Sequence, residues 1–376
     1  MKLLADLTPL RESPAFRRLW AGTTLSSVGG AMTMFAVTLQ VYDMTRSSAA
    51  VGLLGLVTLV PLLAVGLPGG ALIDATDTRR LVLVSTVALA AVSAAFTAQA
   101  ALGPPHLGLR GCYFIDTVSF AGALYGVGRL PSDNSKKRGV RTEAAPAAAG
   151  AEDAAAENKA SHRERAAVSS VLAGFSFIGR TPVLAGAFLA DVAATFFGLP
   201  TSLFPAINAE RFGADPRTLG LFTAAIGVGG LVTAVLSGPL RHVARPGAAM
   251  LGAVTVWGAA FAAFALAPGL WLTLLALGVA GAADTVTVVI RGTIVSTVTP
   301  PEFRGRVMSA DYVVGAGGGQ LGSLEAGVVG SLTTPVTGAL SGGLATIAAA
   351  IAIAVALPAF RRYRADGGAV RGRSSG

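Results

Sequence analysis

Residues 129–167 read RLPSDNSKKRGVRTEAAPAAAGAEDAAAENKASHRERAA and divide the chain into two hydrophobic halves. This stretch mixes Lys and Arg with Ala, Ser, Glu and Pro, and nothing in it can bury a core. Such a composition is typical of a solvated linker that has no chemistry of its own. Because basic connectors of a membrane protein stay on the cytoplasmic side, the linker also predicts the orientation of the other segments.

The composition on both sides of the linker indicates a membrane protein. Of the 376 residues, 53% are hydrophobic and only 13% are charged, whereas soluble domains carry about 25% charged residues. Nearly uncharged runs such as 49–73 and 81–103 are longer than the roughly 20 residues that cross a bilayer. We therefore predict an all-α polytopic membrane protein. The formal net charge of +9 comes from short basic clusters between apolar runs, which favours topological anchoring over nucleic-acid binding.

The apolar runs predict about ten transmembrane helices. Four precede the linker, at residues 19–42, 49–73, 81–102 and 112–128. Six follow an amphipathic surface helix at 168–180, and they lie at 182–207, 219–240, 248–267, 270–295, 307–329 and 335–357. The predicted domains are an N-terminal bundle at 1–128, the linker at 129–167, a C-terminal bundle at 168–360 and a cytoplasmic tail at 361–376.

The distribution of basic residues predicts the topology. With the N-terminus placed inside, 25 of the 29 Lys and Arg residues fall on the cytoplasmic side. The four on the opposite side are Arg46, Arg110, Arg211 and Arg217. Such a bias predicts that both termini and the linker lie in the cytoplasm, in a protein of the cytoplasmic membrane. Two helical halves joined in this way are also typical of secondary transporters.

Two loops on the predicted cytoplasmic side, one in each half, carry the strongest motifs. The first motif consists of Gly69, Gly70, Asp74, Arg79 and Arg80. The second lies in PEFRGRV, residues 301–307, and consists of Arg304, Gly305 and Arg306. Glycines let helices approach closely, and an acid beside paired arginines can form charge-assisted bonds. We interpret both loops as latches that hold neighbouring helices in one conformation.

With these loops, the segments FRRLWAGTTLSSVGGAMTMFAVTLQVYDMT (16–45) and ADVAATFFGLPTSLFPAI (190–207) resemble the major facilitator superfamily. Within the superfamily, these segments are most similar to the enterobactin-exporter-like and macrolide-efflux-like branch. The resemblance covers nearly the whole chain outside the linker. It implies a two-bundle fold of twelve helices. We count ten, because the third helix runs into GLRGCYFIDTVSF (108–120), which resembles the sixth helix of the family.

The fourth and fifth helices of the family are then missing from this chain. In the family these helices carry a membrane-embedded arginine linked to proton coupling and a Gly/Pro-rich antiporter signature. The first loop also departs from the family pattern, because Ala75 stands where an arginine usually follows the aspartate. Both departures put the transport function in doubt.

Ionisable residues inside the helices are the functional candidates, because each costs about 2.5 to 3.5 kcal/mol at a helix centre. Asp191 lies about 14 Å inside the cytoplasmic end of its helix and could bind a proton or a cationic group. Alternatively, its carboxylate could form only a structural hydrogen bond to a neighbouring helix. Asp284 and Arg291 share one helix face and could line the cavity, but for Arg291 we favour snorkelling to the interface. Asp116 is predicted to be an interfacial cap rather than a transport residue, and Glu325 is a weaker cavity candidate.

Other patterns are interpreted as packing. Residues 317–322 spell GxGxxG inside an apolar helix with no preceding strand, which favours helix packing over dinucleotide binding. The GxxxG pairs Gly66/Gly70 and Gly338/Gly342 are also interpreted as packing signals rather than as a dimer interface. We therefore expect a monomer. One cysteine and three scattered histidines give no metal-ligand spacing. Hydrolase and Walker motifs are absent from the sequence, so we predict neither an enzyme nor a cofactor.

The resemblance implies a secondary transporter that exports a small hydrophobic or amphiphilic solute, of drug, macrolide or siderophore type. Its mechanism would be alternating access driven by proton antiport. The expected partners are the solute, protons and the lipid bilayer, without nucleic acid. A second hypothesis stays open: a non-transporting membrane protein, either degenerate or regulatory, because an N-terminal half of four helices breaks the 3+3 repeat. The product of a deleted or erroneous gene is a version of this second hypothesis.

Overall fold

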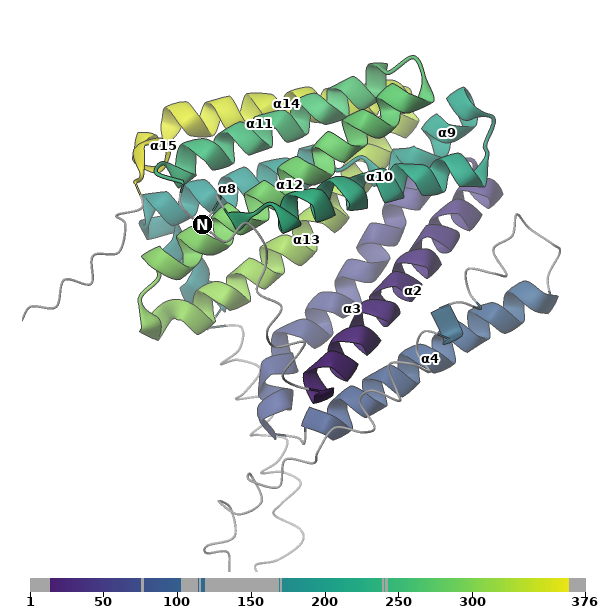
Figure 1. Ribbon diagram of the computed structural model, residues 1–376, viewed down its shortest axis with the longest axis horizontal. Coiled ribbons are helices and arrows are strands. Elements are labelled where there is room, and N and C mark those ends of the chain that lie inside the picture. Colours follow the sequence, from purple (N-terminus) through teal and green to yellow (C-terminus); the bar gives the residue numbers. More distant parts are fainter. Residues whose placement is uncertain are drawn as a thin grey trace, which may run out of the picture. The chain divides into compact units, whose positions relative to one another are not determined.

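A computed structural model of the chain describes residues 14–75, 78–102, 114, 116–118, 169, 171–238, 240 and 243–364. Every regular element within these residues is a helix (Figure 1), which confirms the predicted all-α class. The predicted linker at 129–167 and all but the start of the tail at 361–376 lie outside the described residues. The number of membrane helices and the domain boundaries therefore stay predictions.

The first three predicted helices are present with wider bounds. In the structure α2 spans Pro14–Thr45, α3 spans Ser48–Ala75 and α4 spans Thr78–Leu102. Arg46 in the turn between α2 and α3 has a φ of 50°, a left-handed conformation that turns the chain sharply. Of the predicted fourth helix at 112–128, only residues 114 and 116–118 are described, and these are helical.

The C-terminal part follows the predicted order of helices. Its elements are α8 (Pro182–Phe197), η1 (Thr201–Leu203), α9 (Phe204–Phe212), α10 (Pro216–Val235), α11 (Pro246–Leu266), α12 (Leu270–Val298), η3 (Pro301–Phe303), α13 (Arg304–Leu332), α14 (Pro335–Ala356) and α15 (Pro358–Arg362). A short helix, Val171–Arg180, precedes them and buries one side through Val171, Gly174 and Ile178. Five described stretches are long and apolar enough to cross a membrane, namely Pro182–Phe212, Pro216–Val235, Pro246–Leu266, Leu270–Val298 and Pro335–Ala356.

The helix predicted at 182–207 lies within one membrane-crossing stretch, Pro182–Phe212, but it is interrupted in the structure. In the structure α8 ends at Phe197, and η1 and α9 follow a break at residues 198–200. Pro200 has no N–H to continue the helical hydrogen bonds, and the residue before a proline is disfavoured in a helix. The indole N–H of Trp257 in α11 donates to the Gly198 carbonyl at 2.7 Å. This bond satisfies a carbonyl that the break leaves without a helical partner.

The described residues divide into two compact units. Of these residues, one unit contains 41–63 and those from residue 171 onward, and the other contains 14–40, 64–75, 78–102, 114, 116–118 and 169. Within the first unit, the start of α3 packs closely on α13. This is shown by Gly55, where an added Cβ would meet the Gln320 carbonyl. Thr58 also donates to Gln320 Oε1 at 3.4 Å. The first unit therefore joins residues from both sides of the predicted linker.

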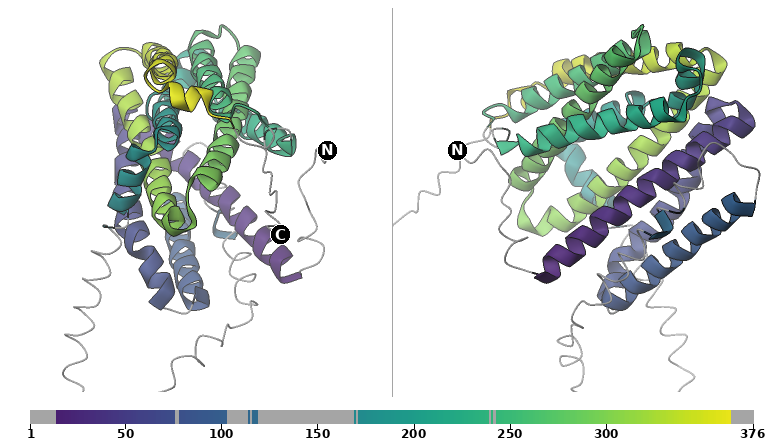
Figure 2. Two further views of the ribbon diagram at one scale, coloured as in Figure 1. Left: turned by 90° about the vertical axis from the view of Figure 1, so that its left-hand side faces the viewer. Right: turned by 45° about the vertical axis from the view of Figure 1, so that its right-hand side comes forward.

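Helices of the first unit lie side by side in pairs. α11 runs along α14 and α10 runs along α12 (Figure 2). Helices in lipid gain no hydrophobic free energy by associating, so close packing must hold them together, and small residues permit it. At the α10–α12 crossing, a Cβ added at Gly281 would meet the Ile226 carbonyl, whereas one at Gly278 would lie 3.6 Å from the Ala225 carbonyl.

This difference predicts the effect of two alanine substitutions on stability. Gly281→Ala is expected to lower the free energy of unfolding by about 1 to 3 kcal/mol, because the new methyl group is forced against backbone. Gly278→Ala is the matched control, since its methyl group meets only an ordinary van der Waals contact. Thermal unfolding in detergent should give a lower midpoint for Gly281→Ala alone. Equal midpoints would show that the crossing is looser than described.

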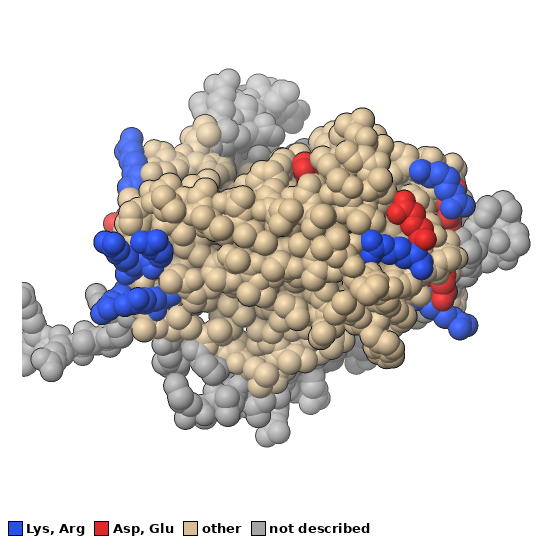
Figure 3. Space-filling model, turned by 90° about the horizontal axis from the view of Figure 1, so that it is seen from above, with Lys and Arg blue, Asp and Glu red and all other residues tan. Residues whose placement is uncertain are grey.

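The outer surface of the first unit suits a bilayer. The face drawn in Figure 3 carries its Lys and Arg side chains at the two ends and is nearly uncharged between them. Large apolar side chains are exposed along the helices, including Val228, Leu231, Trp271, Leu275 and Val355. An exposed apolar band between charged ends is the pattern of a membrane-spanning bundle.

Candidate functional site

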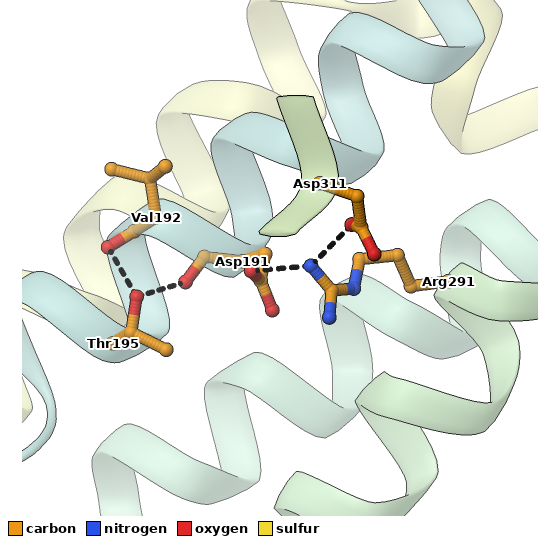
Figure 4. A network of polar contacts seen from close by, with 5 residues as sticks. All are labelled: Asp191, Val192, Thr195, Arg291 and Asp311. Carbon is orange, nitrogen blue, oxygen red and sulfur yellow. Dashed lines mark hydrogen bonds and ion pairs between the residues drawn. The ribbon is translucent and has the colours of Figure 1, made fainter. Parts of the chain in front are cut away.

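An ion-pair network in the first unit joins three helices. Arg291 of α12 donates from Nη1 to Asp191 Oδ2 on α8 at 2.8 Å, and from the same nitrogen to Asp311 Oδ1 on α13 at 2.8 Å (Figure 4). Within the described part of the chain, the remaining ion pair is the surface contact between Arg46 and Asp43 at 3.7 Å. The network is therefore the one place in these residues where charges pair inside the bundle.

The packing of α8 against α13 brings the network together. Asp191 is 4% exposed, and Thr195 one turn later donates to the Asp191 carbonyl at 2.9 Å. A Cβ added at Gly318 of α13 would meet the Thr195 side chain, and one at Gly322 would meet the Thr195 carbonyl. Because α13 lies this close to α8, Asp311, two turns before Gly318, reaches the guanidinium that binds Asp191.

The network holds one positive charge between two carboxylates. The side chains of Asp191, Arg291 and Asp311 are 6%, 13% and 28% exposed, and charges so removed from water are costly unless they are paired. One guanidinium neutralises only one carboxylate, so the network carries a net charge of −1 when both acids are ionised. A proton or the cationic group of a solute can neutralise the remaining charge.

The prediction that Arg291 snorkels to the interface is wrong. Its guanidinium lies inside the bundle because two carboxylates on other helices offer charge-assisted bonds. Asp284, two turns earlier on α12, is half-buried and forms no ion pair among the described residues. Glu325 on α13 is also half-buried and likewise has no ion-pair partner in the described part. A role for either acid in a transport cavity stays a prediction.

Asp116 lies in the other unit and is 2% exposed. Its Oδ2 accepts hydrogen bonds from Thr33 of α2 at 2.6 Å and from Ser93 of α4 at 2.8 Å. Thr117 extends the cluster, with its Oγ1 3.1 Å from Ser93 Oγ and 2.9 Å from Thr97 Oγ1. Asp116 thus joins α2 and α4 through hydroxyl groups, which a buried carboxylate needs as donors. This position differs from the predicted interfacial cap.

The family follows from a comparison with known proteins. A family model of the major facilitator superfamily, described as a transmembrane secretion effector, matches residues 4–115 and 151–367. The chain belongs to this family. The branch predicted from the sequence motifs is confirmed by relatives named enterobactin exporter EntS.

Relatives of this chain from Escherichia coli, Shigella boydii and Escherichia fergusonii are each named enterobactin exporter EntS. Each is 29% identical over 197 residues, which cover 52% of this chain and 47% of the relative. The alignment therefore spans about half the length of the curated relatives. The family and the relatives' names point to a multi-pass membrane transporter rather than an enzyme.

The second motif loop of this chain is held by aromatic contacts. Phe303 stacks on Phe177 of the helix Val171–Arg180, with ring centroids 4.5 Å apart. The Arg306 guanidinium lies 5.3 Å from the Phe303 ring, within the range of a cation–π interaction. Arg304 and Arg306 are exposed and form no ion pair among the described side chains. The charged latch predicted for this loop stays a prediction.

The first motif loop joins α3 to α4. Gly69, Gly70 and Asp74 lie in the last turns of α3, and Arg79 and Arg80 lie in the first turn of α4. Their side chains are outside the described part of the structure. A latch formed by this loop also stays a prediction.

Helix packing explains the glycine patterns at 317–322 and 338–342, as predicted, whereas the surroundings of Gly66 and Gly70 lie outside the described part of the structure. Gly318 and Gly322 of the GxGxxG run face α8, as described above. A Cβ added at Gly338 of α14 would lie 3.0 Å from Gly330 Cα, and one at Gly342 would meet the Phe197 carbonyl. Both members of this GxxxG pair therefore serve contacts within one chain.

Proposed function

We propose that this protein exports a small hydrophobic or amphiphilic solute of siderophore type across the cytoplasmic membrane by proton antiport. The family description and the enterobactin exporters among its relatives support a transporter for such a solute. The single observation that carries the mechanism is the network of Asp191, Arg291 and Asp311. Ionisable groups inside a membrane bundle are costly and typically belong to ion or proton pathways.

The geometry of the network suits a two-state switch. Arg291 uses one nitrogen for both carboxylates, so neither acid holds the guanidinium alone. Protonation of Asp191 removes the attraction of α8 for Arg291 and leaves the guanidinium paired with Asp311 on α13. Loss of the proton restores the bond between α8 and α12. The proton therefore biases which helices are bonded, as alternating access requires.

The energetics permit this mechanism. One charge that crosses a potential of 100 mV releases about 2.3 kcal/mol, enough for a roughly fifty-fold solute gradient. A net charge of −1 on the network attracts the proton, and the apolar helices around it suit a solute that is largely hydrophobic. We place both termini in the cytoplasm, because the excess of Lys and Arg in the connecting segments favours that side.

Efflux from energised cells tests the proposed function. Cells that express the chain are loaded with a fluorescent amphiphile, and its loss is followed with and without a protonophore. We expect faster efflux than from cells with an empty vector, and we expect the protonophore to reduce the rate to the empty-vector level. If a protein that is well inserted gives only the empty-vector rate, the non-transporting hypothesis is favoured instead.

A further inference from the structure

We propose that a cavity between the start of α11 and α15 binds the phosphate headgroup of an anionic membrane phospholipid. The cavity has a volume of about 580 Å³ and is lined by Arg245, Ala248, Arg361, Arg362 and Arg364. Four of its five lining residues are thus arginines, whose guanidinium groups match the geometry of phosphate oxygens. The proposal does not depend on the transport mechanism.

The backbone around the cavity is held in place by Phe360, which is fully buried. A Cβ added at Gly186 of α8 would meet the Phe360 ring, and one at Gly247 of α11 would meet its carbonyl. α15 is therefore packed tightly against both helices. Arg361 and Arg362 follow Phe360 directly, so their backbone positions beside the start of α11 are fixed by this contact.

Within the described part of the chain, the positive charge of the cavity is not compensated. Among the described residues, none of its four arginines forms an ion pair. Four like charges around one cavity repel one another, and an anion between them removes that repulsion. α11 adds to the effect, because it begins here without a side-chain cap. The free N–H groups of its first turn and its dipole favour a negative charge.

The position of the cavity favours a lipid over a free phosphate ion. α14, which is long and apolar enough to span a membrane, ends at Ala356, immediately before α15. Ile351 and Val355 in its last two turns are 57% and 71% exposed. In Figure 3 the basic side chains at the end of the bundle adjoin the nearly uncharged band. A phospholipid can place its phosphate among the arginines and its acyl chains along α14, whereas a free ion uses only the arginines.

Lipid titration of the full chain in neutral detergent tests this proposal. Native mass spectrometry would count bound phosphatidylglycerol, with phosphatidylcholine and inorganic phosphate as the comparison probes. We expect phosphatidylglycerol to bind in preference to phosphatidylcholine and to resist displacement by inorganic phosphate. The double variant Arg361→Gln/Arg362→Gln should bind it about thirtyfold more weakly, since each basic side chain near a membrane surface contributes about fivefold to the affinity.

Two further variants make the result specific to the cavity. Arg46→Gln/Arg217→Gln removes the same charge from exposed positions elsewhere and should bind phosphatidylglycerol as the wild type does. Ala248→Glu places a carboxylate in the cavity at a helix N-terminus, where it stabilises the helix, and should nevertheless weaken lipid binding. Equal binding by all variants would overturn the proposal in favour of general surface attraction. Displacement of phosphatidylglycerol by inorganic phosphate would contradict the proposal that the ligand is a lipid.

Discussion

Asp191→Asn is expected to abolish proton-driven efflux while leaving the protein folded and inserted. The substitution removes the excess negative charge, so the network no longer exchanges a proton. Arg291 keeps Asp311 as its partner at 2.8 Å, so neither charge that remains in the network is left without a partner. Cells with the variant should lose the roughly fifty-fold solute gradient that one proton can sustain at 100 mV. The measurement is the steady-state distribution of a fluorescent amphiphile across the membrane at matched protein levels.

Asp215→Asn provides the matched control for this experiment. Asp215 is the exposed N-cap of α10, where it accepts a hydrogen bond from the Arg217 backbone N–H at 2.9 Å. Asn caps a helix about as well as Asp, so the same chemical change should leave both stability and efflux unchanged. Asp311→Asn should lose the gradient as Asp191→Asn does, because Arg291 then stays on Asp191. Normal efflux by Asp191→Asn would remove this residue from the mechanism.

Arg291→Gln is expected to destabilise the protein strongly. The substitution leaves the carboxylates of Asp191 and Asp311 without their common partner, and Asp191 is almost fully buried. Breaking a buried ion pair by removing one partner costs about 3 to 5 kcal/mol. The variant should therefore show a lower unfolding midpoint in detergent and reduced amounts of folded protein in the membrane.

A rescue experiment separates this charge effect from a loss of packing. The triple variant Asp191→Asn/Arg291→Gln/Asp311→Asn has no charge in the network, and it should recover most of the lost stability. Arg217→Gln, an exposed change of the same kind, should stay within about 0.5 kcal/mol of the wild type. The charge account fails if the triple variant is as unstable as Arg291→Gln alone.

Most of the fold follows from simple properties of the sequence. Long apolar runs predict the helices because a backbone in lipid must satisfy its own hydrogen bonds, and the motif segments indicate the family. The break at residues 198–200 is different, because prolines are also tolerated inside membrane helices. What holds the break is the bond from Trp257 to the Gly198 carbonyl. That bond joins residues 59 positions apart and leaves no local signal.

The site was only partly predictable for a related reason. Asp191 is found because an acid deep in an apolar helix is costly and so demands an explanation. The snorkelling predicted for Arg291 is wrong because its position along one helix shows how far it lies from the interface, but not which acids face it from α8 and α13. Asp311 was missed because it follows Arg304 and Arg306 near the start of α13, where charged residues are ordinary. Its partnership with Arg291 depends on the close packing at Gly318 and Gly322.

Proton movement in proteoliposomes tests the central claim most directly. The purified protein is reconstituted with a pH-sensitive dye inside the vesicles, and a gradient of the amphiphile is imposed across the membrane. The proposed antiport predicts that protons move against the solute in wild-type vesicles and that Asp191→Asn vesicles show no proton movement. Solute transport without proton movement in the wild type, or equal proton movement in Asp191→Asn, would contradict the account.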